Sequence, residues 1–224
     1  MGGWIFAAGL TVGIVYCWAM WRRLARAEFI RSYVFPQGLF DKLHAKRPTL
    51  DVKQMQLVTQ GLRQFFLAHL HSGRKFVSMP SQVADDLWHE FILYTRNYDG
   101  FCRRAFGRFM HHTPAVALGR AQQNNIGLRR TWWYTCKDEN INPRTPTRLP
   151  LLFALDAKLG IGDGFVYAPD CSKLRDRQDG TVHCGGDFSS GSVDGSTEGF
   201  GDGGAGDSGG GDSGCGGGCG GGGD

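Results

Sequence analysis

Glycine and acidic residues are concentrated at the C-terminal end of this chain of 224 residues. Of its 35 glycines, 21 lie between Gly180 and Asp224, together with seven acidic side chains and no Lys or Arg. A segment of this composition buries too little apolar surface to offset the entropy that folding removes. We therefore expect residues 180–224 to be a disordered Gly/Asp-rich tail, and a compact domain to form only within the first 179 residues.

Charge follows the same division of the chain. The tail has a formal charge of −7, whereas the preceding residues carry 25 basic against 14 acidic side chains, or +11. The remaining length excludes a two-domain enzyme of ordinary size. The basic excess favours a lipid bilayer with anionic headgroups as a partner, and because the basic residues are scattered, no nucleic acid is expected. The acidic tail is expected to contact a protein partner.

The N-terminus contains twenty consecutive residues without a charge, Gly2 to Trp21. As a helix this run spans about 30 Å, the thickness of the hydrocarbon core of a bilayer. We therefore predict a transmembrane anchor over residues 1–21. The aromatic and basic residues typical of a membrane interface are Trp4, Trp18, Trp21, Arg22 and Arg23.

Two alternatives to a retained anchor are a cleaved signal peptide and a buried core helix. A signal peptide needs positive charge before the apolar run and small residues after it, and neither is present here. A core helix fits poorly because the run is apolar on every face. With basic residues only after the span, the positive-inside rule predicts an outside N-terminus and a cytoplasmic domain. The cysteines beyond the span are then expected to be thiols or metal ligands rather than disulfides.

The segment between the anchor and the tail reads as an all-α domain. Apolar residues recur with a period near 3.6, and glycine, serine and proline punctuate the pattern. The only strand signal is a short one at Phe165 to Tyr167. We predict a juxtamembrane helical segment over 22–48, a helical domain over 49–160 and a linker over 161–179. The individual helices are expected at Leu50–His71, at Ser81–Thr95, from Thr113-Pro114 toward Trp132, and at Leu149–Leu159.

Metal-ligating residue types gather within thirty residues of this domain. Asp85 and His89 are four residues apart and so share one face of a helix, and Cys102 and His112 follow. A carboxylate, a thiol and imidazoles are ligands that zinc or iron uses. The alternative is a structural polar network, since a buried Asp–His hydrogen bond between two helices needs the same residues.

Three further hypotheses use neighbouring residues. Cys102 with a histidine would form a nucleophilic pair if the two were within hydrogen-bond distance. In a metal-dependent enzyme, Glu90 or Asp86 would serve as the base. A separate soft-metal site in the C-terminal region would use Cys171, His183, Cys184, Cys215 and Cys219.

The same stretch resembles a known family. Val83 to His89, Tyr98 to Cys102 and Phe106 to His112 are similar to the glycine-rich domain-containing protein-like family, in a bacterial, membrane-anchored branch. The resemblance implies a motif and a glycine-rich C-terminal region, but no established reaction. The residues that fall on its motif are Asp85, Trp88, His89, Tyr98, Cys102, Gly107 and His112.

The sequence thus predicts a membrane-tethered binding or scaffolding module rather than an enzyme. Asp85, His89, Cys102 and His112 form its structural or metal-binding cluster, and Trp88, Tyr98 and Gly107 support that cluster. No cofactor is certain, and zinc or iron is the candidate. The alternative is a metal-dependent enzyme that uses the same cluster.

Overall fold

The computed structural model describes residues 2–112, 122–169 and 182–184, with side chains described for residues 8–112 and 126–169. Within these residues the chain is almost entirely helical, as the sequence predicts. The two strands are three residues long and pair in parallel, with Tyr167 opposite His183. The helices are α1 (Gly2–Ser32), α2 (Leu39–Lys46), α3 (Val52–His71), α4 (Gln82–Leu93), α5 (Thr95–Phe106), α6 (Gln122–Asp138) and α7 (Leu151–Leu159), and the strands are β1 (Val166–Ala168) and β2 (Val182–Cys184).

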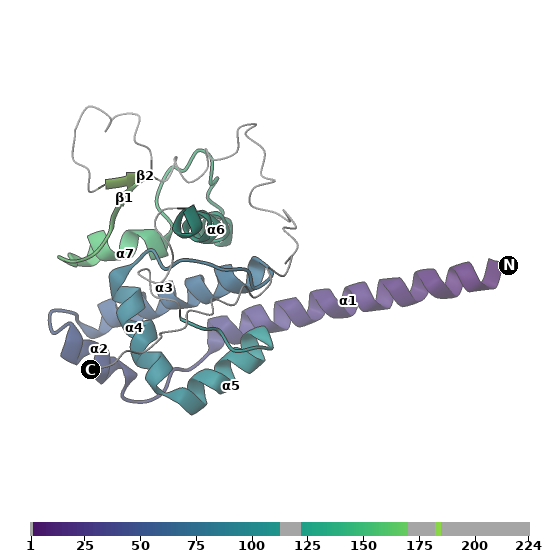
Figure 1. The fold of residues 1–224 in the computed structure, drawn as a ribbon, viewed down its shortest axis with the longest axis horizontal. Coiled ribbons are helices and arrows are strands. Elements are labelled where there is room, and N and C mark those ends of the chain that lie inside the picture. The colour runs from purple at the N-terminus through teal and green to yellow at the C-terminus, as the bar shows by residue number, and fades with distance from the viewer. Residues whose placement is uncertain (1, 113–121, 170–181, 185–224) are drawn as a thin grey trace, which may run out of the picture.

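Helix α3 forms the centre of the domain. It packs against α1, α4, α6 and α7, and in Figure 1 it lies between α6 and α7 on one side and α4 and α5 on the other. Its first turn is closed by a capping box, in which Asp51 accepts from the Gln54 amide and the Gln54 side chain accepts from the Asp51 amide. Its buried polar residue Gln64 donates to Glu139 and accepts from the Leu152 amide, so burial leaves neither end of the side chain unpaired.

The start of helix α4 is fixed by a carboxylate from α7. Ser81 is the N-cap and accepts from the Ala84 amide. Asp156 lies against the same end, where it accepts hydrogen bonds from the Ser81 hydroxyl at 2.7 Å, the Gln82 amide at 2.7 Å and the Val83 amide at 3.2 Å. A helix N-terminus presents unpaired amides and a partial positive charge, so a carboxylate there stabilises it. Helix α7, near the C-terminal end of the domain, therefore positions the first turn of α4 through Asp156.

The predicted helices agree with α3, α4 and α7 to within a few residues. The predicted start at Thr113-Pro114 lies outside the described residues, whereas the helix toward Trp132 is α6. Helices α2 and α5 were not expected as separate elements. The short turn at Tyr94, with φ −79° and ψ 61°, ends α4 and starts α5 without any Gly or Pro to signal it.

The predicted membrane anchor over residues 1–21 is not supported by helix α1. Among the described residues, no helix is long and apolar enough to cross a bilayer. The side chains of residues 1–7 lie outside the described residues, Trp4 among them. The prediction of a single-pass membrane protein with a cytoplasmic domain is therefore wrong.

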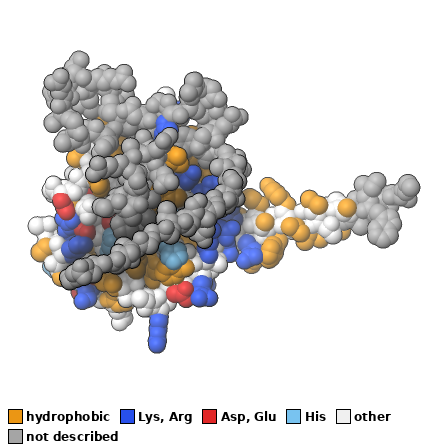
Figure 2. Space-filling model, viewed as in Figure 1, with side chains coloured by type: hydrophobic (Ala, Val, Ile, Leu, Met, Phe, Trp, Pro, Cys, Tyr) orange, Lys and Arg blue, Asp and Glu red, His pale blue; other side chains and the backbone are white. Residues whose placement is uncertain are grey.

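Three of the residues assigned to the membrane interface, Trp18, Arg22 and Arg23, have contacts within the chain. The Arg22 guanidinium lies 4.5 Å from the centre of the Trp18 ring. Arg23 donates to the backbone oxygen of His71 at 2.7 Å. Trp21 is exposed on the projecting part of α1, whose apolar side chains are visible in Figure 2. Arg23 therefore attaches the middle of α1 to the end of α3.

Helix α1 continues without a break from its projecting part into the domain. Ala27 and Ile30, in its last two turns, are buried in the core. There the helix packs against α3 and α5. The one helix thus combines a projecting N-terminal part with a C-terminal part that belongs to the domain core (Figure 1).

Candidate metal centre

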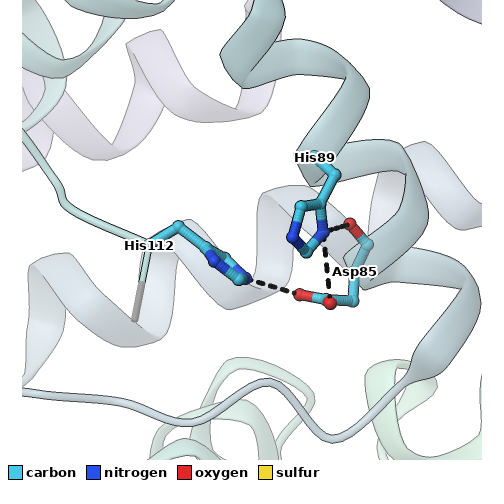
Figure 3. Close-up of side chains that lie close together, drawn as sticks. All are labelled: Asp85, His89 and His112. Carbon is cyan, nitrogen blue, oxygen red and sulfur yellow. Dashed lines mark hydrogen bonds and ion pairs between the residues drawn. The ribbon is translucent and has the colours of Figure 1, made fainter. Parts of the chain in front are cut away.

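Asp85, His89 and His112 converge at the surface of the domain (Figure 3). One ligand atom from each lies within 4.8 Å of the other two. Oδ1 of Asp85 is 3.1 Å from Nε2 of His112, and Oδ2 of Asp85 is 3.2 Å from Nδ1 of His89. The two imidazole rings have centroids 4.1 Å apart. We call these three residues the triad.

Two elements bring the triad together. Asp85 and His89 are one helical turn apart on α4, as the i, i+4 spacing predicts. The Nδ1 atom of His89 also lies 2.9 Å from the backbone oxygen of Asp85, a contact that fixes the ring orientation. His112 comes from the segment that follows α5, and its ring meets the Trp88 ring edge to face at 4.6 Å. The third residue is therefore positioned by an aromatic contact rather than by helix geometry.

Trp88 and Tyr98 hold the segment that carries His112. The indole nitrogen of Trp88 donates to the Tyr98 hydroxyl at 3.2 Å, and that hydroxyl donates to the backbone oxygen of Met110 at 2.6 Å. Both side chains are buried. This chain of hydrogen bonds connects α4, α5 and the backbone two residues before His112.

Gly107 makes the turn from α5 into this segment. Its φ is +77°, in the left-handed region that glycine adopts without steric cost. Its amide bonds the backbone oxygens of Cys102 and Arg103, which closes the end of α5. An added Cβ would also lie 2.9 Å from the Arg26 guanidinium. The Arg26 side chain is flexible and can move aside, so the backbone angle is the reason that this position favours glycine.

Cys102 is not a member of the triad. It is fully buried in the core behind Tyr98, and burial raises the pKa of its thiol. A thiol with a raised pKa is a poor nucleophile at neutral pH because the thiolate is the reactive form. The structure therefore brings together three of the four residues of the predicted cluster, and the hypothesis of a Cys102 nucleophile has no support in this geometry.

The two proposed bases lie apart from the triad. Asp86 is buried and is paired with Lys46 and Arg47, each at 2.7 Å. Glu90 follows His89 on α4 and does not line the cavity that adjoins the triad. The hypothesis of a soft-metal site at Cys171, His183, Cys184, Cys215 and Cys219 lies outside the residues whose side chains are described.

A cavity of about 570 Å³ adjoins the triad, and Asp85 is the triad residue that lines it. This volume is within the range of small-molecule sites in proteins. The cavity lies between the α3–α4 connection, the first turns of α4 and the segment after α5. Its charged and titratable lining residues are His69, Arg74, Asp85, Arg108 and His111.

Sequence reasoning missed Asp156, Arg74 and Arg108. Asp156 sits in an apolar helix with no local signal, because all the groups that it bonds are distant in the sequence or outside the helix. Arg74 follows Ser72-Gly73, which marks the end of a helix but says nothing about a cavity. Arg108 lies inside the stretch singled out by the sequence, between Gly107 and His112, and its position was the only available signal.

One comparison with known proteins assigns the chain to a family. A family model described as UCP032817-like matches residues 25–188. The chain belongs to this family. The match to the UCP032817-like family spans α2 to α7, the triad and the cavity. No curated protein and no solved structure matches the chain.

The UCP032817-like match corrects the resemblance drawn from the sequence. Nothing indicates a glycine-rich domain family, so the assignment to the glycine-rich domain-containing protein-like family is wrong. That assignment depended on short motifs around Asp85, Tyr98 and His112. Each of these motifs has a local structural reason, namely a helix face, an aromatic hydrogen bond and a turn, and such features recur in unrelated proteins.

Proposed function

We propose that this member of the UCP032817-like family binds a divalent transition metal, zinc or iron(II), through Asp85, His89 and His112. The observation that carries the proposal is the convergence of the three ligand atoms within 4.8 Å, from two separate elements. Two ligands each about 2.0–2.1 Å from a tetrahedral ion lie about 3.3 Å apart. The Asp85 carboxylate contacts are of similar length, 3.1 Å from Oδ1 to Nε2 of His112 and 3.2 Å from Oδ2 to Nδ1 of His89. Each contact uses a different carboxylate oxygen, so a metal held by one oxygen requires a small rotation of the side chains.

The ligand set favours an open site over a purely structural one. Structural zinc sites have four protein ligands and are rich in cysteine, whereas sites that exchange ligands have three protein ligands and a free position. Two histidines and one carboxylate are also the ligand set of non-haem iron(II) sites. Because Asp85 also lines the cavity, a metal at the triad would lie beside it. The cavity would then leave space for a small molecule to occupy the free coordination position.

The competing interpretation is a metal-free network in which His112 bonds Asp85 and packs on Trp88. Isothermal titration of the full chain with Zn²⁺, after chelator treatment and dialysis, separates the two. A parallel titration with Fe²⁺ under anaerobic conditions compares the two metals. We expect one equivalent of metal to bind at the triad.

His89→Ala is the informative variant because His89 is half-exposed, so its loss leaves the fold intact. We expect it to weaken binding at this site by about 100-fold or more, since it removes one of three ligands. His111→Ala is the matched control, an adjacent histidine that is outside the triad, and it should leave the affinity unchanged.

Cobalt substitution tests where the metal lies. Co²⁺ at the triad gives visible d–d bands without a thiolate charge-transfer band, because no cysteine is a ligand. Equal affinity of the native chain and His89→Ala would overturn the proposal. So would a thiolate charge-transfer band that accounts for all of the bound cobalt, since the metal would then be held by cysteines elsewhere.

A further inference from the structure

The cavity beside the triad has a basic wall formed by Arg74 and Arg108. Both line it, and among the described residues that line it Asp85 is the only acidic one. Within the described residues, neither guanidinium is ion-paired with a carboxylate, whereas Arg31, Arg47, Arg103 and Arg148 are. With a divalent ion at the triad the charge of Asp85 is neutralised, so the cavity as a whole is positive.

Backbone contacts hold the two guanidinium groups in place without using all their donors. Arg74 donates from Nη1 to the backbone oxygen of Phe106 at 3.0 Å. Arg108 donates from Nη2 to the backbone oxygen of Arg74. Each guanidinium carries five N–H donors in a fixed plane, so donors remain for a planar anion.

Arg74 adopts an unusual backbone conformation at this wall. Its φ is +66°, and it directly follows Gly73, whose φ is +74°. A non-glycine residue in the left-handed region costs about 1–2 kcal/mol. Strained residues of this kind concentrate at functional sites. Glycine would adopt this backbone conformation at a lower conformational cost. The advantage of arginine at this position therefore comes from its side chain.

His69, deep in the same cavity, adds no positive charge at neutral pH. Burial, together with the smaller effect of the charges on Arg108 and Arg74, lowers its pKa to about 4. Its Nδ1 lies 3.0 Å from the backbone oxygen of Lys75, which fixes the ring. The positive charge of the cavity is therefore located on the two arginines and on the metal at the triad.

The cavity also has an apolar, partly open side. Phe76, Phe109 and Phe165 line it and are 38%, 41% and 42% exposed. The other apolar lining residues are Val77, Met79, Trp88 and Met110. Three half-exposed phenylalanines around one cavity are favourable contacts for a hydrophobic group of a ligand, because their exposed area is then removed from water.

We infer that this cavity binds a small organic anion, with its charged group against Arg74 and Arg108 and its hydrophobic part against Phe76, Phe109 and Phe165. The anion is a carboxylate or phosphate ester bearing an aromatic or aliphatic group. This inference rests on the proposed metal site for the neutralisation of Asp85, but the basic wall and the apolar lining exist without the metal.

The alternative role for the two arginines is structural. They bond the end of α5 to the α3–α4 connection, and Arg26 also approaches the Phe106 oxygen, at 3.5 Å. Cations at the C-terminus of a helix stabilise it without any ligand. A purely structural role predicts no difference between a charged probe and a neutral probe of the same shape.

The test is a titration of the full chain, loaded with Zn²⁺, with benzoate, phenyl phosphate, inorganic phosphate and benzamide, followed by calorimetry. Benzamide has the shape of benzoate but no charge. We expect benzoate or phenyl phosphate to bind at least tenfold more tightly than benzamide and inorganic phosphate. The anion that binds with the higher affinity shows whether the site prefers a carboxylate or a phosphate.

Two variants locate the site on the basic wall. Arg74→Gln and Arg108→Gln should each weaken binding of the stronger anion about tenfold. Arg96→Gln, an exposed arginine on α5 that does not line the cavity, should leave it unchanged. Thermal unfolding followed by circular dichroism checks that each variant is folded. If Arg74→Gln is unfolded, Arg108→Gln and Phe165→Ala test whether the anion binds in this cavity, because each removes part of a different wall. Both should weaken binding of the anion.

The outcomes separate this inference from the proposed function. Zinc binding lost in His89→Ala, with benzoate, phenyl phosphate and benzamide binding equally or not at all, would overturn the anion site and leave the metal site standing. Anion binding that depends on Arg74 and Arg108 in a chain that binds no zinc would support the cavity and overturn the metal site. Anion binding unaffected by either arginine variant refutes the inference whatever the metal does.

Discussion

Replacing Asp156 with asparagine tests how the start of α4 is held. The Asp156 carboxylate is 2% exposed and accepts four hydrogen bonds. One oxygen accepts from the Ser81 hydroxyl and the Val83 amide. The other accepts from the Gln82 amide and from the Phe165 amide at 2.9 Å. All four partners are donors, so the site is complete only with two acceptor oxygens.

Asparagine has nearly the same shape but replaces one oxygen with an NH₂ group. In either orientation two of the four donors then face a donor. Each hydrogen bond to a charged group contributes about 1.5–3 kcal/mol, so we expect Asp156→Asn to lower the free energy of unfolding by about 3–5 kcal/mol. That is a large part of the total stability of a domain of this size, about 5–15 kcal/mol.

Urea unfolding of the full chain, followed by circular dichroism and tryptophan fluorescence, measures this loss. Asp99→Asn is the matched control, because Asp99 is half-exposed on α5 and its ion pair among the described residues is with Arg103, one turn away. Such a pair contributes about 0.3–0.5 kcal/mol. A change below 1 kcal/mol for Asp156→Asn would refute the reasoning, since it would mean that the α4 amides are satisfied without the carboxylate.

Two further predictions concern His69 and Gly107. Burial lowers the pKa of His69 from 6.5 to about 4 in the folded chain, so between these pH values the unfolded chain binds more protons and stability falls as the pH falls. The loss of unfolding free energy reaches about 3 kcal/mol near pH 4. In His69→Gln the slope of unfolding free energy against pH between 6.5 and 4 should be smaller. An unchanged slope would contradict this prediction. Gly107→Ala should lower the free energy of unfolding by about 1–2 kcal/mol because φ is +77°, whereas Gly100→Ala, inside α5 with open space around it, should raise it by about 0.5–1 kcal/mol. Chemical denaturation measures both, and a loss of equal size in the two alanine variants would show that the backbone angle at Gly107 is not the cause.

The sequence was sufficient where the structure depends on local spacing. The i, i+4 rule predicts that Asp85 and His89 share one face of α4, and the 3.6-residue period predicts α3, α4 and α7. The position of His112 depends on Trp88, Tyr98 and the turn at Gly107, which act together only after α4 and α5 have packed. Spacing alone therefore cannot distinguish His112, a member of the triad, from Cys102, which is buried in the core.

The predictions of a membrane anchor and of the family resemblance were wrong for a related reason. Hydropathy measures composition along one segment, and the second half of α1 is charged and contributes Ala27 and Ile30 to the core. The motif around Asp85 and Tyr98 was matched by short stretches, whereas the UCP032817-like model matches residues 25–188 as a whole. The acidic tail, the protein partner predicted for it and the domain boundaries stay predictions.

The carboxylate of Asp156 also imposes an order on folding. A ribosome delivers Asp85 and His89 about 70 residues before it delivers the group that caps their helix. Until α7 has emerged and docked, the first turn of α4 has no partner for the Gln82 and Val83 amides, and native contacts so far apart in sequence form late. A nascent chain that stops before residue 156 would therefore hold Asp85 and His89 on a frayed helix. The triad reaches its final geometry only when nearly the whole domain has been synthesised.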